Sequence, residues 1–202
     1  RNLEEYYDND LLESIQGIVN GSTNYILTKT FKDNLSYEDA LKEAQEKGFA
    51  ESNPILDTGG FDAKYKLLIL LAHSFGYIAK PDDLLNIGIN NISGLELKYA
   101  REKGLKIKLV AQAFKNLDGN ISAFVIPKFV DAEDRLFNVD DVFNGVITKT
   151  SFADEQFFVG KGAGAHPTAS AVLSDISALS YDYQYEYKKI AQQEDLSLSD
   201  DV

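Results

Sequence analysis

Two charged side chains at the start of an apolar segment have a spacing that proton-transfer chemistry can use. Asp62 and Lys66 are four residues apart, and on a helix that spacing places the carboxylate and the ammonium on one face, about one turn apart. The acid lies on the N-terminal side, as the helix dipole favours. The run LLILLA follows Lys66 directly, so we expect core residues to desolvate this lysine partly. A desolvated lysine can exchange protons near neutral pH.

Further acidic side chains lie just before this pair. Glu51 follows a helix end predicted at Gly48, and Asp57 precedes the glycine pair 59–60. A plain structural interpretation competes, in which Asp62 and Lys66 form an exposed ion pair worth only about 0.3 to 0.5 kcal/mol and the other acids decorate a loop. Taken alone, that interpretation is favoured. Only the position of the pair at the head of an apolar helix argues against it.

The whole stretch 48–66, GFAESNPILDTGGFDAKYK, resembles a motif of the homoserine dehydrogenases, in which a Gly-aromatic-x-Glu-x-x-Pro loop leads through an Asp and a Gly to Asp-x-x-x-Lys on a helix. The segments 17–27, GIVNGSTNYIL, and 160–176, GKGAGAHPTASAVLSDI, resemble the same family and occur in the same order. The resemblance covers most of the chain, from Leu11 to Ile176. One departure is Asn53, where the family commonly has an acid; it affects only a secondary contact.

The resemblance implies reversible hydride transfer between NAD or NADP and the aldehyde of L-aspartate 4-semialdehyde, which gives L-homoserine. It implies that Lys66 and Asp62 are catalytic and that Gly164 lies near the cofactor. The substrate-binding residues that it implies are Glu51, Asp57, Ser22, Gly21 and Phe49. It further implies a homodimer, and a nucleotide-binding domain outside this chain. Without that domain, which binds most of the cofactor, we expect this chain to be inactive.

The reaction suits these residue types. Reduction of an aldehyde builds negative charge on the former carbonyl oxygen, which an ammonium such as that of Lys66 can stabilise and protonate. The ammonium group of an amino-acid substrate needs anions, which Glu51, Asp57 and Asp62 can supply. An alternative stays open, namely a non-catalytic module for dimerisation or amino-acid binding.

Two glycine-containing turns also have a plain interpretation. The turn 20–22, Asn-Gly-Ser, follows a strand predicted at 14–19. The resemblance places Asn20, Gly21 and Ser22 at the edge of the substrate pocket, whereas from the sequence alone a simple strand-to-helix turn is favoured. The run 160–164, GKGAG, precedes a helix predicted at 167–179. Glycines before a helix can admit a phosphate, but close packing of a strand and a helix explains this run equally well. No strand followed by GxGxxG opens the chain.

Composition sets the remaining bounds. The chain has 202 residues, 44% of them hydrophobic, a formal net charge of −12, no Cys and no Met. Without Cys there are no disulfides or thiolate metal sites, and we assign no metal ligands. The acidic balance argues against nucleic-acid binding, and no run approaches the roughly 20 apolar residues of a membrane helix, so a cytoplasmic protein is expected. A start at Arg1 without an initiator Met favours a fragment or a processed product.

Helices early in the chain and paired strands late predict an α+β fold, a mixed sheet with helices packed over one face. Helices are predicted from Thr23, from Ser36 to Gly48, at 61–75 and from Ser93 to Gly104. Strands are predicted at 86–90, 145–150 and 156–159, with a hairpin of 105–114 and 121–130 that has one polar and one buried face. The hairpin turn at 116–120 contains Asp-Gly.

Domain organisation follows from these elements. Residues 1–160 are predicted to form the catalytic and dimerisation domain, and 161–192 the glycine-rich segment and a C-terminal helix that would return to the absent Rossmann domain. Residues 193–202 have little to bury and are predicted to be a frayed acidic tail. The alternating tyrosines at 181–189 suggest a strand or, less well without basic neighbours, a stacking platform. His73 lies in an apolar helix and is expected to be buried.

Overall fold

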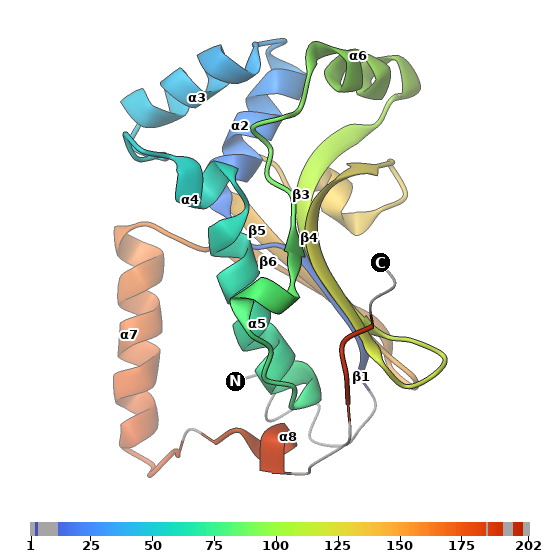
Figure 1. Ribbon diagram of the computed structural model, residues 1–202. Helices are drawn as coiled ribbons and strands as arrows, with labels where there is room; N and C mark the ends of the chain where they lie inside the picture. Colours follow the sequence, from blue (N-terminus) through green and yellow to red (C-terminus); the bar gives the residue numbers. More distant parts are fainter. Residues whose placement is uncertain (1–2, 4–11, 185, 192–195, 200–202) are drawn as a thin grey trace.

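The structure, a computed structural model, describes residues 3, 12–184, 186–191 and 196–199 (Figure 1). In chain order its elements are β1 (Leu12–Ile18), α2 (Gly21–Lys32), α3 (Tyr37–Glu46), α4 (Ile55–Thr58), α5 (Phe61–Phe75), the 3-10 turn η1 (Pro81–Asp83), β2 (Leu85–Asn86), α6 (Gly94–Lys103), β3 (Lys106–Lys115), β4 (Ile121–Val130), the 3-10 turn η2 (Arg135–Asn138), β5 (Phe143–Thr150), β6 (Asp154–Lys161), α7 (Ala165–Leu179) and α8 (Lys188–Ala191).

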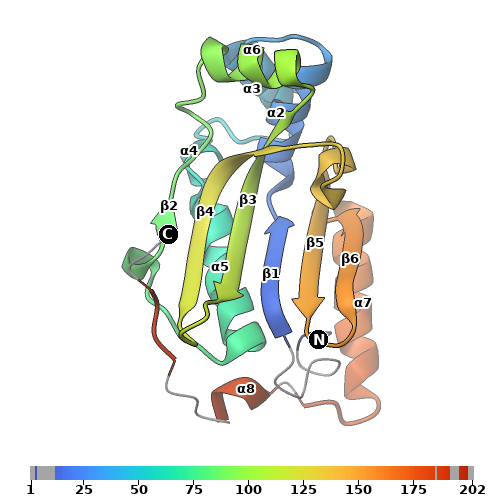
Figure 2. The same ribbon diagram turned by 90° about the vertical axis from the view of Figure 1, so that its right-hand side faces the viewer.

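The strands form a single mixed sheet in the order β2-β4-β3-β1-β5-β6. β2 runs parallel to β4, and the other neighbouring strands are antiparallel. Figure 2 shows this sheet in front of α5 and α7, so the long helices lie behind one face. The predicted α+β fold, with a mixed sheet and helices over one face, is confirmed.

Local capping signals set the helix boundaries. Ser36 caps α3 by accepting a hydrogen bond from the backbone N–H of Asp39 at 3.1 Å. Ser93 and Glu96 form a reciprocal capping box at the start of α6, which satisfies two backbone donors at once. Gly76 ends α5 with φ of 70°, a left-handed conformation that glycine adopts without a steric penalty. α5 has the predicted boundaries.

The β3–β4 hairpin is confirmed, with Lys106 opposite Val130 at one end of the register and Lys115 opposite Ile121 at the other. The predicted polar face carries Lys106 and Lys108, but this part of it is also buried. Lys108 is only 1% exposed and Lys106 is also buried, because η2 and the segment after it cover them. Both ammonium groups donate hydrogen bonds to the carboxylate of Asp140.

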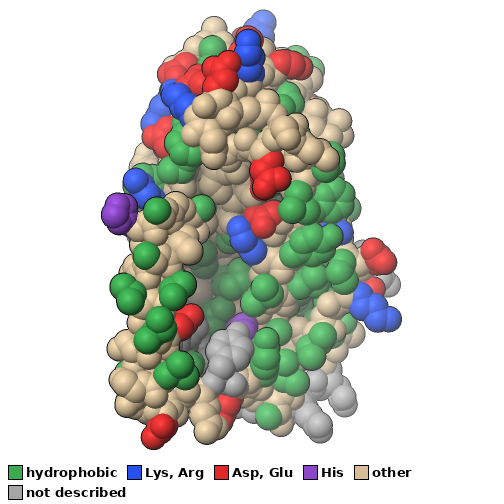
Figure 3. Space-filling view, turned by 90° about the vertical axis from the view of Figure 1, so that its left-hand side faces the viewer, with side chains coloured by type: hydrophobic (Ala, Val, Ile, Leu, Met, Phe, Trp, Pro, Cys, Tyr) green, Lys and Arg blue, Asp and Glu red, His purple; other side chains and the backbone are tan. Residues whose placement is uncertain are grey.

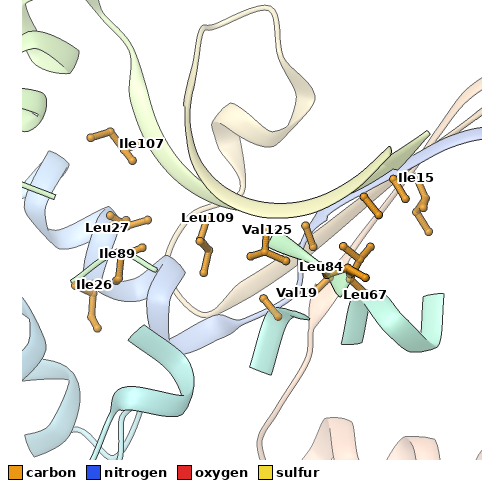
Figure 4. Packing of buried hydrophobic residues seen from close by; sticks show 14 of the residues in the cluster. Ile15, Val19, Ile26, Leu27, Leu67, Leu84, Ile89, Ile107, Leu109 and Val125 are labelled. Atoms are coloured by element: carbon orange, nitrogen blue, oxygen red, sulfur yellow. The ribbon is translucent and has the colours of Figure 1, made fainter. Parts of the chain in front are cut away.

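The hydrophobic core lies mainly between the helices and the sheet. Ile26, Leu67 and Val125, from α2, α5 and β4, are among the side chains that meet there (Figure 4). A smaller cluster lies under η2, on the other face of the sheet, and consists of Ile18, Val110, Leu136, Val139 and Ile147. The centre of the sheet is therefore buried on both faces, which suits its runs of β-branched residues.

α7 stands apart from α5 on one side of the molecule and buries only Ala178 (Figure 1). Its apolar side chains Leu173 and Ile176 are exposed, and Figure 3 shows hydrophobic side chains gathered on the side of the molecule that carries this helix. Large exposed apolar patches commonly mark interaction surfaces. None of the described helices has the length and hydropathy of a membrane span.

The C-terminal part differs from the sequence-based prediction. The alternating tyrosines form no strand in the described residues of 181–189, and α8 begins at Lys188. Tyr187 instead stacks on His73, with ring centroids 4.7 Å apart, and the buried position expected for His73 is confirmed. β2 is shorter than the strand predicted at 86–90, while β5 and β6 extend beyond their predicted ends. The short elements α4, η1 and η2 were not predicted.

The predicted acidic tail is also partly wrong. Of residues 193–202, only 196–199 lie within the described part of the chain. There the N–H of Ile121 donates to the carbonyl of Ser197 at 2.9 Å, and the N–H of Ser199 donates to the carbonyl of Ile121 at 2.8 Å. Leu198 packs against the core, which an acidic composition alone does not indicate.

The turn between α4 and α5 is held by a contact that leaves no room for a side chain at Gly88. A Cβ atom there would lie 2.2 Å from the carbonyl oxygen of Thr58 and 2.5 Å from Cα of Gly59. We expect Gly88→Ala to lower the free energy of unfolding by about 1 to 3 kcal/mol, the usual cost of overpacking, measured by urea unfolding. Gly94→Ala is the control, since nothing lies within 4 Å of a Cβ there. Equal midpoints for both variants would contradict this explanation.

Candidate active site

A cavity of about 380 Å³ lies where the start of α2, the loop after α3 and the α4–α5 turn meet. Its lining residues are Asn20, Gly21, Ser22, Gly48, Phe49, Asp57, Asp62, Lys66, Val142, Ala163 and Gly164. Every residue predicted for the site lines this cavity except Glu51. Segments far apart in the sequence therefore meet around one space.

The amide group of Asn20 joins two carboxylates in this cavity. Its Nδ2 donates to Oδ1 of Asp57 at 2.7 Å and to Oδ2 of Asp62 at 2.8 Å. Its Oδ1 accepts a hydrogen bond from the backbone N–H of Thr23 at 2.9 Å and so caps α2. Asn20 is buried, and these contacts fix its amide in one orientation. The acids of α4 and α5 are thereby held side by side.

Lys66 lies at the edge of the same group. Its Nζ donates to Oδ2 of Asp62 at 2.7 Å and to the carbonyl of Val19 at 3.0 Å. The side chain of Lys66 is 47% exposed, so the core covers it only in part. α5 turns Leu67 and Leu71 into the core, whereas Lys66 lies on the side of the helix that also exposes Ile69.

Glu51 does not line the cavity. It lies exposed on the loop after α3, where its backbone carbonyl accepts a hydrogen bond from Nε2 of Gln45 at 2.9 Å. The loop thus has an anchor to α3, and it carries Phe49 into the cavity wall while Glu51 remains outside. Its predicted role in substrate binding stays a prediction.

The wall at Phe49 is held by a polar cluster behind it. The Ser22 hydroxyl donates to the carbonyl of Phe49 at 2.6 Å, and the Phe49 ring packs on Tyr25 with centroids 4.8 Å apart. The Tyr25 hydroxyl donates to Glu43 at 2.7 Å. Hydrogen bonds from Lys47 and then from Tyr25 lower the pKa of Glu43 to about 2, so this carboxylate is ionised at neutral pH and keeps its donors in place.

In the glycine-rich run before α7, one glycine fits close packing of a strand and a helix, and another fits contact with a ligand. At Gly162 a Cβ would lie 2.0 Å from Nδ2 of Asn144, so the Asn144 side chain packs closely on this glycine and would have to shift if a larger residue replaced it. Gly164 lines the cavity and has φ of 116°, a conformation that L side chains rarely adopt. One glycine thus serves packing, and the other places bare backbone in the cavity wall.

Some functional positions escaped sequence reasoning. Asn20 was placed at the edge of a pocket, but nothing in the sequence indicated that it bridges two acids; an Asn before a helix signals a cap, not a carboxylate partner. Val142 lies far from the other lining residues in the sequence and belongs to no motif. Tyr25 supports Phe49 from within α2, and the helix predicted from Thr23 gives no indication of this contact.

Chemically, the cavity combines an ammonium with two carboxylates. The lysine can donate or accept a proton, and the acids can hold it or bind a positively charged group. Across the part of the chain that the structure describes, no three or more His, Cys, Asp or Glu side chains are grouped to hold a metal ion. The ammonium and the two carboxylates suit acid–base chemistry on a small polar molecule.

Comparison with known proteins agrees with this chemistry. Residues 1–177 match the family described as homoserine dehydrogenase. The homoserine dehydrogenase of Helicobacter pylori is 44% identical over 163 residues, which are 81% of this chain and 38% of that protein. That of Methanocaldococcus jannaschii is 42% identical over 168 residues, 83% of this chain and 48% of that protein. This chain thus spans less than half the length of these curated relatives.

Solved structures give the same result. A homoserine dehydrogenase from Thiobacillus denitrificans superposes with a TM-score of 0.90 at 31% identity, covering 98% of this chain and 48% of that one. A hyperthermophilic archaeal homoserine dehydrogenase in complex with NADPH superposes with a TM-score of 0.70 at 31% identity, covering 86% of this chain and 49% of that one. Since the family match extends over most of its length, this chain belongs to the homoserine dehydrogenase family.

Proposed function

We propose that this chain is the substrate-binding and catalytic part of a homoserine dehydrogenase, which interconverts L-homoserine and L-aspartate 4-semialdehyde with a nicotinamide cofactor. The observation that carries the proposal is the meeting of Lys66, Asp62 and Asp57 in one cavity beside Gly164. Membership of the family supports the reaction type, and the cavity supplies the groups that the reaction needs.

Lys66 is the proton-transfer residue in this proposal. When the aldehyde is reduced, its oxygen gains negative charge, and the ammonium at Lys66 donates the proton that completes the alcohol. In the reverse direction the neutral amine accepts the proton from the hydroxyl of homoserine. Asp62, 2.7 Å from Nζ, orients the lysine and stabilises its charged form. The exposure of Lys66 allows the proton to exchange with solvent after each turnover.

The carboxylates supply the anionic environment that the substrate ammonium requires. Asp57 and Asp62 are 37 and 42 residues from Asn20 in sequence, yet the shared amide places both in the cavity. Their remaining lone pairs can accept hydrogen bonds from an ammonium. We assign Glu51 the outermost of these contacts and Ser22, Gly21 and Phe49 the walls around the substrate.

The glycine-rich run fits a cofactor contact. Nothing lies within 4 Å of a Cβ placed at Gly160, and only Cδ of Pro167, at 3.7 Å, approaches one placed at Gly164. The backbone there is open to a ligand, and Gly164 would touch the cofactor, which supplies the hydride when bound. NADPH is present in the archaeal relative, and we propose NAD or NADP for this chain. The alternative of a non-catalytic module is not favoured by the family match.

Lys66 can be tested in a fusion in which this chain replaces the matching segment of the Helicobacter pylori enzyme. We expect homoserine-dependent reduction of NADP or NAD by the fusion, and none by the isolated chain. Lys66→Ala should lower kcat by about 10² to 10⁴-fold, the usual effect of losing a general acid or base.

The control for Lys66 is Lys98→Ala on α6. Lys98 also forms an i,i+4 ion pair, with Glu102 at 3.8 Å, but it is 72% exposed and lies outside the cavity. If Lys66→Ala and Lys98→Ala have the same kcat, with both folds intact by circular dichroism, then Asp62 and Lys66 are an ordinary surface pair.

Glu51 is expected to behave differently from Lys66. Glu51→Gln should raise KM for homoserine more than it lowers kcat, because an anchor holds the ground and transition states alike. Steady-state kinetics of the same fusion measure both constants. Glu46→Gln, at an exposed acid of α3, is the matched control. A drop in kcat at unchanged KM would assign Glu51 to the chemical step instead.

We also propose that the chain forms a homodimer through the sheet. Exposed aromatic side chains at its borders, Phe129 on β4 and Phe158 on β6, support a contact there. Sedimentation velocity should give a dimer, and Phe129→Asp should shift it toward monomer. A clean monomer of the unaltered chain at tens of micromolar, a rough scale for weak association, would refute the proposal.

A further inference from the structure

The segment 139–143, which leads into β5, contributes one residue to the cavity wall. Val142 of this segment lines the cavity. A Cβ placed on Gly21 would lie 3.0 Å from the carbonyl oxygen of Val142, so the start of α2 and this segment touch backbone to backbone. Any shift of the segment would therefore move both Val142 and the α2 residues that face the substrate.

Asn24 holds this segment on both sides of Val142. Its Nδ2 donates to the carbonyls of Val139 and Phe143, each at 3.0 Å. One helical turn later, the hydroxyl oxygen of Thr28 accepts a hydrogen bond from the N–H of Asp141 at 3.0 Å. α2 thus binds the segment through three hydrogen bonds, and Asn24, only 1% exposed, makes two of them.

Lys108 fixes the orientation of Asn24. Its Nζ donates to Oδ1 of Asn24 at 3.1 Å, to the carbonyl of Val139 at 2.5 Å and to Oδ1 of Asp140 at 2.9 Å. An ammonium can only donate, so the amide oxygen must face it. The two N–H groups of the amide are then left for the two carbonyls beside Val142.

Burying these charged groups costs desolvation free energy, so the arrangement is not an efficient way to stabilise a fold. Asp140 also binds Lys106 at 2.9 Å and Lys32 at 3.0 Å, so three ammonium groups meet one carboxylate. Burial lowers the pKa of Lys108 despite its hydrogen bond to Asp140. Buried charges lose hydration that their partners only partly replace, and such groups tend to specify geometry more than they add stability.

We propose that Lys108, acting through Asn24, is a positioning residue for substrate binding, because it sets the place of the Val142 wall and of Gly21. This proposal rests on the proposed function and adds to it Lys108 and Asn24, which do not line the cavity. Neither side chain touches the cavity, so replacing one of them should change substrate binding (KM) and not the chemical step (kcat).

The test compares Lys108→Met with Asn24→Asp. Methionine keeps much of the length of the lysine but removes the ammonium. Aspartate keeps the shape of Asn24 and a partner for Lys108, yet removes both donors to the carbonyls. In the fusion enzyme each should raise KM for homoserine by about tenfold with kcat changed less than about threefold. In the isolated chain, amide hydrogen exchange of residues 139–143 should be about tenfold faster.

The control variant is Lys98→Met, which should leave both measurements unchanged. If Lys108→Met does not fold, Asn24→Asp decides, and if neither folds the pair serves stability and the proposal is refuted. Wild-type values of KM and of exchange in folded Asn24→Asp would also refute it, as would a fall in kcat at unchanged KM. An inactive unaltered fusion would count against the proposed function alone, because the exchange comparison needs no turnover.

Discussion

The amide of Asn20 allows two like charges to share one cavity. Two carboxylates that approach each other repel and favour a protonated form, unless donors stand between them. Asn20 places one N–H on Asp57 and the other on Asp62, and its oxygen is fixed by the first turn of α2. Three elements, α2, α4 and α5, are thereby locked together through one side chain, and the geometry of the site depends on it.

The acids can converge only if the α4–α5 turn is held from the sheet side as well. The N–H of Ile89 donates to the carbonyl of Thr58 at 2.7 Å, and Nδ2 of Asn86 donates to the carbonyl of Gly59 at 2.8 Å. The turn itself needs Gly60 at φ of 78°. β2 and the residues just after it thus fix the turn that separates Asp57 from Asp62, through one side-chain and one backbone hydrogen bond.

Local signals in the sequence predicted much of the fold, whereas burial was harder to predict. Capping residues and C-terminal glycines predicted the limits of α5 and α6. The residues predicted for the site do line one cavity, apart from Glu51. The run after Lys66 looked apolar on every side, yet only one stripe of α5 packs on the sheet, so Lys66 is exposed. Lys106 and Lys108 belong to the predicted polar face of the hairpin, and η2, later in the chain, buries them. Which stripe or face is covered depends on distant segments that local patterns do not encode.

A shifted pKa and access to the substrate are often both taken as marks of a catalytic lysine. In this chain the first belongs to Lys108 and the second to Lys66. Lys108 is buried and burial lowers its pKa, but it faces Asn24, Val139 and Asp140 and not the cavity. Lys66 lines the cavity and is exposed enough to exchange protons. A perturbed pKa also arises in structural ion-pair networks, so access to the substrate is the better criterion. By that criterion Lys66 is the better candidate for proton transfer, and the role that we propose for Lys108 is to hold the wall at Val142 in place.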